Sequence, residues 1–453
     1  MVGAPRKLGP VPGFERPALR GMPASPLPLR GCPLPEPLFR RPGVCPLPQV
    51  APAAGERRGC FMNAARSKLR LAVFVPGGVG PPGSSHRVPA LAHLLEALSK
   101  TFSVSVFSMT PQPYPPEEPT PFQLFAPARA TSRPGGAAAM VMARFVHMHR
   151  RRPFHLIHGF WALPSGLLAG WLGRWSGLPV LLTLMGGETA RLTGLRYGNC
   201  TRRHHCRLTR WACRLARAVV VLSNHQAEQL SRLHWPVRKL ACIPFGPLPD
   251  FYRPAPAKLT PPFRLLQAAN LTPVKDQLSL LHAVDRLRRH VPVQLQIVGP
   301  DYWQGTVQRR CAALGLNPLV QFLGPLDHRR LPALYHRAQV YLQTSLHEAQ
   351  GVSVAEAAAA GLFLAGTHTG LLADLAPEGA LTVPPGDWQG LADRLLAMLK
   401  QPEKAMPFQW QALRWAQAHP FDSTVQGYLR LYRALQNEKL TSPGKTGRRE
   451  AGR

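Results

Sequence analysis

Residues 345–361 read SLHEAQGVSVAEAAAAG and place two carboxylates, Glu348 and Glu356, around a short turn of small residues. Gly351 lies in that turn, where the absence of a side chain lets a ligand approach the backbone closely. The Ala-rich run over residues 354–360 predicts a helix that the final glycine of the stretch ends. The N–H groups of a first helical turn attract anions, so the stretch predicts an anion site between two carboxylates.

The position of the two carboxylates says which ligand would suit this stretch. A carboxylate beside an anion site repels phosphate, so each should contact neutral hydroxyls such as those of sugars. The layout therefore favours a ligand with phosphate in the middle and polyol at both ends, which describes a nucleotide-sugar. A second interpretation needs no ligand, because Ser353 and Glu356 have the spacing of a helix capping box. From this stretch alone both interpretations stay open.

Six further segments follow one another in the order of a known family. They read LAVFVPGGVGPPGSSHRVPALAHLLEAL (71–98), HLIHGFWALPSGLLAG (155–170), IPFGPLPDFYRP (243–254), FRLLQAANLTPVKDQLSLLHAVDRL (263–287), VQLQIVGP (293–300) and VQFLGPLDHRRLPALYHRAQVYLQTS (320–345). Together with the two-glutamate stretch they resemble the retaining glycosyltransferases of family 4, over roughly residues 68–435. The resemblance implies the GT-B fold, an α/β architecture in which two Rossmann-like domains face a cleft.

Length and hydrophobic patterning lead independently to a similar architecture. A chain of 453 residues exceeds what a single core accommodates, so two domains are expected. Short apolar runs alternate with helical patterns, which is typical of parallel α/β sheets. The runs are LRLAVFV (69–75), VSVF (104–107), LPVLLTL (178–184), AVVVL (218–222), LQIVG (295–299) and VYLQT (340–344).

Composition changes along the chain suggest the domain boundaries. The predicted units are a disordered Pro/Arg-rich extension (1–66), an N-terminal acceptor domain (67–245), a Pro-rich linker (246–262), a C-terminal donor domain (263–415) and a disordered tail (440–453). A helix over residues 423–436 carries an apolar stripe, and the resemblance implies that it crosses back to the first domain. Met62 lies just before the first strand, so a start at that residue is an alternative.

The net charge of +32, from 55 Lys and Arg against 23 Asp and Glu, requires an anionic partner. Nucleic acid, lipid and phosphorylated substrates all qualify. A basic amphipathic helix favours peripheral contact with an anionic membrane and a lipid-linked acceptor, and we expect no nucleic acid. The alternative is a solvated face whose apolar side packs into the first domain. The arginines concerned are Arg203, Arg207, Arg210, Arg214 and Arg217. No apolar run reaches transmembrane length, so we expect a cytoplasmic protein, peripheral at most.

Eight cysteines suggest a reducing compartment rather than a disulfide framework. One cluster invites a metal hypothesis, but it lacks a C-x2-C pair and neighbouring arginines would repel zinc, so unpaired thiols are favoured. The cluster consists of Cys200, Cys206, Cys213, His204 and His205.

The family resemblance implies roles for particular residues. Lys275 would contact the diphosphate, Glu356 the ribose hydroxyls, and Glu348 the donor sugar near its anomeric carbon. Lys275 and Glu348 are the expected catalytic residues. Backbone N–H groups at Gly351, Val352 and Ser353 would complete the phosphate site, and Gly77 and Gly78 would line the cleft from the other domain. No Asp-x-Asp pair is present, so no metal and no cofactor is expected; the donor would be a UDP- or GDP-sugar.

The position of Lys275 supports this interpretation. It precedes a predicted helix, where the helix dipole disfavours a cation and a bound diphosphate would relieve the conflict. The alternative is an exposed lysine balanced by Asp276.

Two positions depart from the family pattern. Asn270 stands where relatives usually have an arginine that assists the lysine, and Arg329 or Arg330 would have to compensate for the lost charge. Met185 stands where many relatives have a histidine that contacts sugar or acceptor, a role that could pass to Glu188.

Two other functions stay open: an NDP-sugar epimerase of the same fold, and a non-catalytic protein that binds anionic polymers or membranes.

Overall fold

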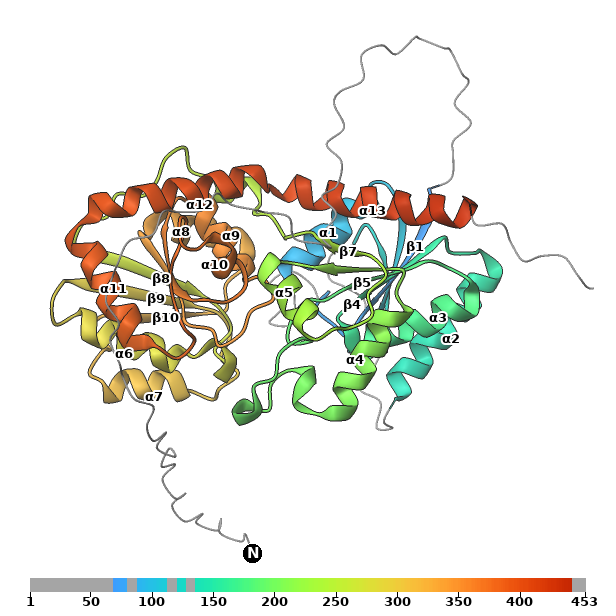
Figure 1. Ribbon diagram of the computed structural model, residues 1–453, viewed down its shortest axis with the longest axis horizontal. Helices are drawn as coiled ribbons and strands as arrows, with labels where there is room; N and C mark the ends of the chain where they lie inside the picture. The colour runs from blue at the N-terminus through green and yellow to red at the C-terminus, as the bar shows by residue number, and fades with distance from the viewer. Residues whose placement is uncertain (1–67, 80–87, 112–119, 128–134, 442–453) are drawn as a thin grey trace, which may run out of the picture. The chain divides into compact units, whose positions relative to one another are not determined.

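A computed structural model of the chain describes residues 68–79, 88–111, 120–127 and 135–441, in which the strands form two separate parallel sheets (Figure 1). The predicted α/β class with two Rossmann-like parts is thereby confirmed. The predicted N-terminal extension and the tail from residue 442 lie outside the described residues.

The first sheet has the strand order β3-β2-β1-β4-β5-β6-β7. Its strands are β1 (Arg70–Val75), β2 (Ser103–Ser108), β3 (Gln123–Phe125), β4 (Leu156–Phe160), β5 (Val180–Thr183), β6 (Ala218–Val221) and β7 (Leu240–Cys242). The helices of this part are α1 (Pro89–Ser99), α2 (Gly136–Arg151), α3 (Leu167–Ser176), α4 (Arg203–Leu215) and α5 (Asn224–Arg232). Every residue of β1 is buried, which explains its continuous apolar sequence, because a parallel strand in the middle of a sheet is covered on both faces.

The second sheet has the order β10-β9-β8-β11-β12-β13. Its strands are β8 (Phe263–Ala268), β9 (Val293–Val298), β10 (Val320–Gly324), β11 (Val340–Gln343), β12 (Phe363–Thr367) and β13 (Leu381–Val383). The helices that follow the linker are α6 (Gln277–Leu287), α7 (Thr306–Ala313), α8 (Leu331–Arg337), α9 (Val352–Ala359), α10 (Gly370–Leu375), α11 (Trp388–Lys400), α12 (Met406–Ala418) and α13 (Phe421–Thr441).

Helix α13 is longer than predicted, since it begins at Phe421 and continues through Thr441. Although α13 follows the helices of the second sheet in the chain, its buried apolar residues pack into the core of the first sheet. Tyr428, Tyr432 and Leu435 are part of the core around β1 and α1. The ribbon of α13 passes beside α1 and β1 (Figure 1). The last helix therefore contributes to the core of the first sheet.

The strand order also predicts where a ligand would bind. In an open parallel sheet, ligands bind beyond the carboxyl ends of the strands, where the order reverses direction. The second sheet reverses between β8 and β11, and the first between β1 and β4. Lys275 follows β8 and the two-glutamate stretch follows β11. The residues singled out in the sequence thus lie at a switch point.

Candidate functional site

A cavity of about 690 Å³ lies at this switch point and is lined by residues from both sheets. Among the predicted residues that line it are Asn270, Lys275, Glu348, Gly351, Val352, Ser353, Glu356 and Met185. The structure therefore brings most of the predicted site together.

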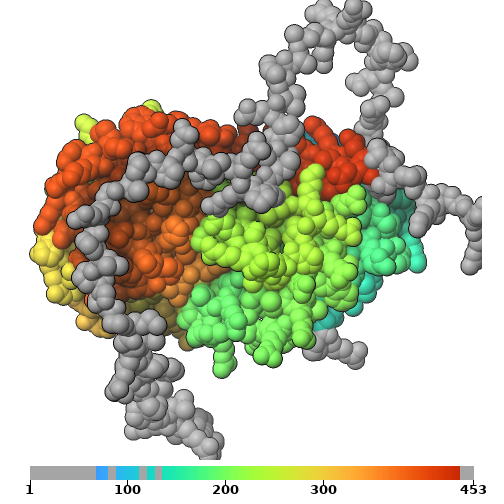
Figure 2. All heavy atoms as spheres, viewed as in Figure 1, coloured from blue at the N-terminus to red at the C-terminus, as the bar shows by residue number. Residues whose placement is uncertain are grey.

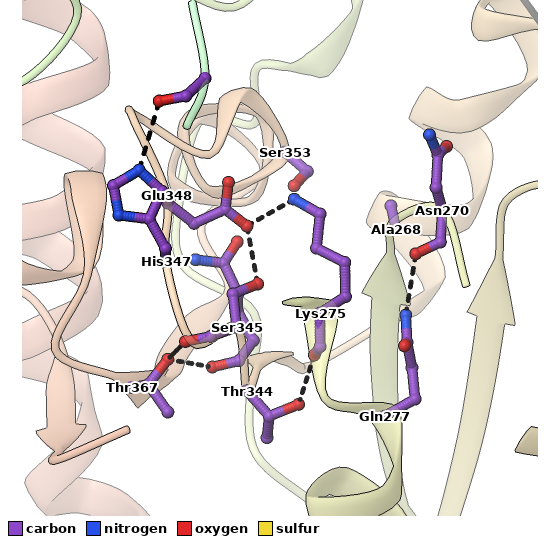
Figure 3. A network of polar contacts seen from close by, with 12 residues as sticks. Ala268, Asn270, Lys275, Gln277, Thr344, Ser345, His347, Glu348, Ser353 and Thr367 are labelled. Carbon is purple, nitrogen blue, oxygen red and sulfur yellow. Dashed lines mark hydrogen bonds and ion pairs between the residues drawn. The ribbon is translucent and has the colours of Figure 1, made fainter. Parts of the chain in front are cut away.

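Lys275 and Glu348 form an ion pair in this cavity, with 2.5 Å between Nζ and Oε1 (Figure 3). Ser345 donates from its hydroxyl to the same carboxylate oxygen at 2.6 Å. Both side chains are largely buried, with exposed fractions of 25% for Lys275 and 10% for Glu348. An incoming anion would therefore have to compete with Glu348 for the lysine.

Backbone contacts between two loops bring this pair together. Lys275 ends a short 3-10 turn, Pro273–Lys275, and Asp276 then caps α6 by accepting from the N–H of Ser279. The hydroxyl of Thr344, just after β11, donates to the carbonyl of Lys275 at 3.1 Å (Figure 3). The lysine therefore stands before α6 in a separate turn, and its position is set by the loop that carries Glu348.

Gly351 starts α9 with a backbone conformation that other residues rarely adopt. Its φ is 83°, and a Cβ at this position would lie 3.0 Å from the Oε1 atom of Gln343. No side chain caps the N-terminus of α9 by a hydrogen bond. The first turn of this buried helix borders the cavity and offers its N–H groups to an anion.

The capping-box interpretation of Ser353 and Glu356 is wrong. The turn at Gly351 begins the helix earlier than predicted, so Ser353 is inside α9, where its hydroxyl oxygen accepts from Tyr341 at 2.7 Å. Glu356 instead contacts His328 Nε2 at 2.8 Å and accepts from the Tyr335 hydroxyl at 2.9 Å. Both glutamates thus present carboxylates at the cavity, one on each side of the helix start.

Of the site residues predicted from the first half of the chain, Met185 lines the cavity, whereas Glu188, Gly77 and Gly78 are not among the described lining residues. The buried carboxylate of Glu188 accepts from the backbone N–H groups of Ala162, Met185 and Gly186 at 2.7–3.3 Å. Burial raises the pKa of Glu188, and these hydrogen bonds oppose the rise. Glu188 therefore holds the loop together rather than facing a ligand.

Gly77 and Gly78 follow β1 beside a segment that the structure does not describe. A Cβ at Gly77 would lie 2.8 Å from the Thr110 hydroxyl oxygen, and Gly78 has a φ of 87°. Neither is among the described lining residues, although Val88, whose N–H donates to the carbonyl of Gly78, does line the cavity.

The structure also places Asn270 and the two arginines that were considered as replacements for its missing charge. Asn270 lines the cavity, and its carbonyl accepts from the Gln277 side chain at 3.0 Å (Figure 3). Arg329 lines the cavity as well, with its guanidinium 2.8 Å from Asp327, whose pKa this contact lowers to about 2. Arg330 is not among the described lining residues.

Helix α4 carries four of the five predicted arginines, all of them exposed. These are Arg203, Arg207, Arg210 and Arg214. The part of the chain around residue 200 forms green surface in Figure 2. The fifth, Arg217, was wrongly placed on this helix: Ala216 is extended, and the Arg217 guanidinium lies 3.0 Å from Glu438 of α13. No helix in the described part of the chain is long and apolar enough to span a bilayer.

The predicted cluster of cysteines and histidines includes Cys200 and Cys206, which lie close together. Within the described ranges, no group of three or more His, Cys, Asp or Glu side chains could hold an ion. Cys200 and Cys206 lie 3.2 Å apart between their sulfur atoms as thiols.

The sequence analysis did not single out three aromatic or imidazole side chains at this site. Tyr197 and His328 line the cavity, and His328 and the buried Tyr335 contact Glu356. His328 and Tyr335 lie in the quoted segment 320–345, whereas Tyr197 lies outside the quoted segments. No local spacing marks their contacts, because the fold brings them together with residues from other loops.

Comparison with known proteins shows which family has this fold and sequence pattern. The family model described as glycosyl transferases group 1 matches residues 250–415, and the glycosyl transferase 4-like domain matches residues 82–246. Glycogen synthase of Mycobacterium tuberculosis is 26% identical over 274 residues, which are 56% of this chain and 66% of the synthase. The matched part is thus just under two thirds of that relative.

Solved structures agree on the fold. Sucrose-phosphate synthase from Thermosynechococcus elongatus superposes with a TM-score of 0.68 at 20% identity, covering 82% of this chain and 100% of the synthase. HepE of Anabaena, solved in complex with UDP and glucose, has a TM-score of 0.62 at 17% identity and covers 81% of this chain and 100% of its own. The two family models together cover the residues that line the cavity and, except for β1, the strands of both sheets. The chain therefore belongs to the glycosyl transferases group 1, in the family 4 type with the GT-B fold.

Proposed function

We propose that this chain transfers a glycosyl group from a UDP- or GDP-sugar to a hydroxyl acceptor, with retention of anomeric configuration and without a metal ion. One observation carries the proposal: a single cavity is lined by a lysine, the first turn of a helix and two carboxylates, the groups expected to bind a nucleotide-sugar. The diphosphate would lie between Lys275 and the first turn of α9. Glu356 would accept from ribose hydroxyls and Glu348 from hydroxyls of the sugar.

The chemistry follows from these positions. As the bond between the anomeric carbon and the diphosphate oxygen breaks, negative charge grows on the leaving group. Lys275 and the N–H groups of α9 stabilise that charge. The acceptor oxygen forms its new bond on the same face of the sugar, and its proton passes to the leaving phosphate oxygen. No separate side-chain base is required.

The relatives support the donor class. HepE, which shares the fold, was solved with UDP and glucose. We therefore expect this chain to bind a nucleoside diphosphate. Because the sequence has no Asp-x-Asp pair, this binding should not require divalent cations.

A thermal-shift panel with UDP, GDP, UDP-glucose and GDP-mannose in EDTA, followed by transfer assays with the same sugars, tests the proposal. Binding to the folded state raises Tm, so the correct nucleotide should give a clear shift. Lys275→Ala should abolish the shift, and the exposed Lys404→Ala should retain it. If no nucleotide shifts Tm and no sugar is transferred, the proposal is wrong. Release of an epimerised sugar, or binding without turnover, would favour the epimerase or the binding protein.

A peripheral membrane contact is a second part of the proposal, and a specific surface favours it. The four arginines of α4 are exposed, and beside them Trp171 and Trp211 are 47% and 44% exposed with ring centroids 5.5 Å apart. Exposed tryptophans next to arginines suit the interface of an anionic bilayer. The acceptor would then be lipid-linked.

Flotation with phosphatidylglycerol-containing liposomes at low salt tests this contact. The wild-type protein should float, because screening of the arginines is weakest there. The double variant Arg207→Glu/Arg214→Glu should remain in the lower fraction. Arg309→Glu/Arg310→Glu on α7 is the matched control, since it reverses two exposed charges elsewhere. Equal flotation of both variants would contradict a contact through α4.

A further inference from the structure

Tyr197 lies in the loop between β5 and α4 and lines the cavity together with Met185, Gly186 and Glu348. Its ring packs against Gly187. A Cβ at Gly187 would lie 2.9 Å from two ring carbons of the tyrosine and 3.1 Å from its hydroxyl oxygen. Only a glycine at this position leaves room for the phenol where it is.

The loop holds this phenol in place through its backbone. Leu192 and Tyr197 exchange two backbone hydrogen bonds of 3.0 and 3.1 Å, and the N–H of Asn199 donates to the carbonyl of Gly187 at 2.9 Å. The buried carboxylate of Glu188 accepts from the backbone N–H groups of Met185 and Gly186 at the start of the same loop, and from that of Ala162, which follows β4. The hydroxyl is therefore positioned before any ligand arrives, and little entropy is lost when it forms a hydrogen bond.

The ionisation state of Tyr197 suits a hydrogen-bond donor. Burial raises its pKa above the ordinary value, and the nearby carboxylates of Glu348 and Glu188 raise it further. The phenol thus keeps its proton throughout the neutral range. The phenol also lines the same cavity as Glu348, the carboxylate assigned above to the transferred sugar, and its ring centroid lies 6.1 Å from that of the neighbouring His347.

We propose that the hydroxyl of Tyr197 donates a hydrogen bond to a hydroxyl of the transferred sugar, and so acts as a specificity-determining residue for the donor. Met185, on the same wall, cannot donate a hydrogen bond. Tyr197 supplies the polar contact from the first sheet, and Glu348 supplies the one from the second. This assignment rests on the proposed function, since it requires a nucleotide-sugar in the cavity.

Calorimetric titration of UDP, UDP-glucose, GDP and GDP-mannose tests the assignment. Tyr197→Phe should weaken binding of the nucleotide-sugar about fivefold to tenfold, as expected for one lost hydrogen bond, and leave the matching nucleoside diphosphate unchanged. Gly187→Ala should give the same selective loss by displacing the ring. Tyr302→Phe, at a 46% exposed tyrosine that does not line the cavity, is the control.

The outcomes separate the two proposals. A Tyr197→Phe protein that binds both nucleotide and nucleotide-sugar like the wild type overturns the assignment and leaves the proposed function standing. An equal loss for both ligands also overturns it, since that result indicates a structural role for the loop. A wild-type protein that binds none of the four ligands overturns the proposed function and the assignment with it.

Discussion

Lys275 is neutralised by Glu348 before any ligand binds, with 2.5 Å between the charged atoms. Glu348→Gln should therefore affect binding and turnover in opposite directions. Without the competing carboxylate, Lys275 should bind UDP or GDP several-fold more tightly, because ion pairs to phosphate are charge-assisted. Sugar transfer should fall by at least tenfold, since the contact near the anomeric carbon weakens. Calorimetry and initial-rate assays measure the two effects.

Glu378→Gln, at an exposed position, is the control for this substitution and should change neither quantity. A Glu348→Gln protein with weaker nucleotide binding would contradict the competition between carboxylate and diphosphate.

Glu356 does not cap α9, so we expect its substitution to change which ligands bind rather than the stability of the helix. Its oxygens contact His328 and Tyr335, and ribose hydroxyls are the ligand group that they are proposed to bind. Glu356→Gln should weaken UDP or GDP about tenfold and leave inorganic pyrophosphate unaffected. Competition titration with both ligands measures this. Ser353→Ala, which removes only the contact with Tyr341, should behave like the wild type; a shared loss for pyrophosphate would refute the ribose role.

At the scale of single residues, the sequence predicted what lies within one motif. Lys275, Glu348 and Glu356 stand in segments with recognisable order, and all three line the cavity. Tyr197 could not be found this way, because its place depends on the fold of a separate loop. His328 stands in a recognised segment, but no spacing in the sequence marks its contact with Glu356. Glu188 was predicted as a possible ligand contact, but its carboxylate accepts hydrogen bonds from backbone N–H groups instead.

Helix α5 shows an element whose N-terminus is completed from another part of the chain. The carboxylate of Asp374, on α10, accepts from the backbone N–H groups of Asn224 and His225 at 2.7 Å each. Asp374→Asn should lower the free energy of unfolding by about 1–2 kcal/mol, the usual size of a helix cap with charge near the N-terminus. Urea denaturation followed by circular dichroism measures it.

The matched control is Asp387→Asn at the N-terminus of α11. That carboxylate caps its own helix by accepting from Gly390 at 2.8 Å and is exposed. Its loss should cost less than the loss of Asp374, because water can replace an exposed cap. Equal costs for the two variants would show that the contact from α10 adds nothing.

At the scale of elements, apolar runs predicted strands well and helix ends less well. All six predicted strands are present with small shifts at their ends, since each is a buried apolar run between turns. Helix α9 begins at Val352 rather than 354, because a glycine with positive φ replaces the expected polar cap. Helix α4 ends at Leu215, whereas the periodicity of the arginines had predicted a helix that continues through Arg217.

The largest features depend on contacts between residues far apart in the sequence. Gln350, in the loop before α9, accepts from the N–H of Phe245 and donates to its carbonyl, both at 2.8 Å. The Ser223 hydroxyl donates to the carbonyl of Ala349 in the same loop at 2.5 Å. No spacing in the sequence predicts such pairs. The order of motifs was sufficient for the fold class, but the contacts between the site loop and residues of the first domain required the structure.

The attachment of α13 to the first sheet makes the stability of the whole molecule depend on pH. His158, buried in β4, contacts the Tyr432 hydroxyl at 2.6 Å and the Thr183 hydroxyl at 2.8 Å. Burial lowers its pKa to about 3. Below the unfolded-state value near 6.5, the unfolded chain binds a proton that the folded chain excludes. The free energy of unfolding should therefore fall as pH drops from about 6.5 towards 3, by at most about 1.4 kcal/mol per pH unit for this group.

His158→Gln should remove this contribution, since glutamine does not titrate. The variant should be less stable than the wild type at pH 7.5, where it loses well-placed hydrogen bonds, and the difference should shrink at pH 5. Urea denaturation at pH 7.5, 6 and 5 measures both quantities. His147→Gln, on the exposed surface of α2, should keep the wild-type slope because its surroundings are solvent. Parallel pH profiles for wild type and His158→Gln would show that the buried imidazole does not set the acid stability of the joint between α13 and the first sheet.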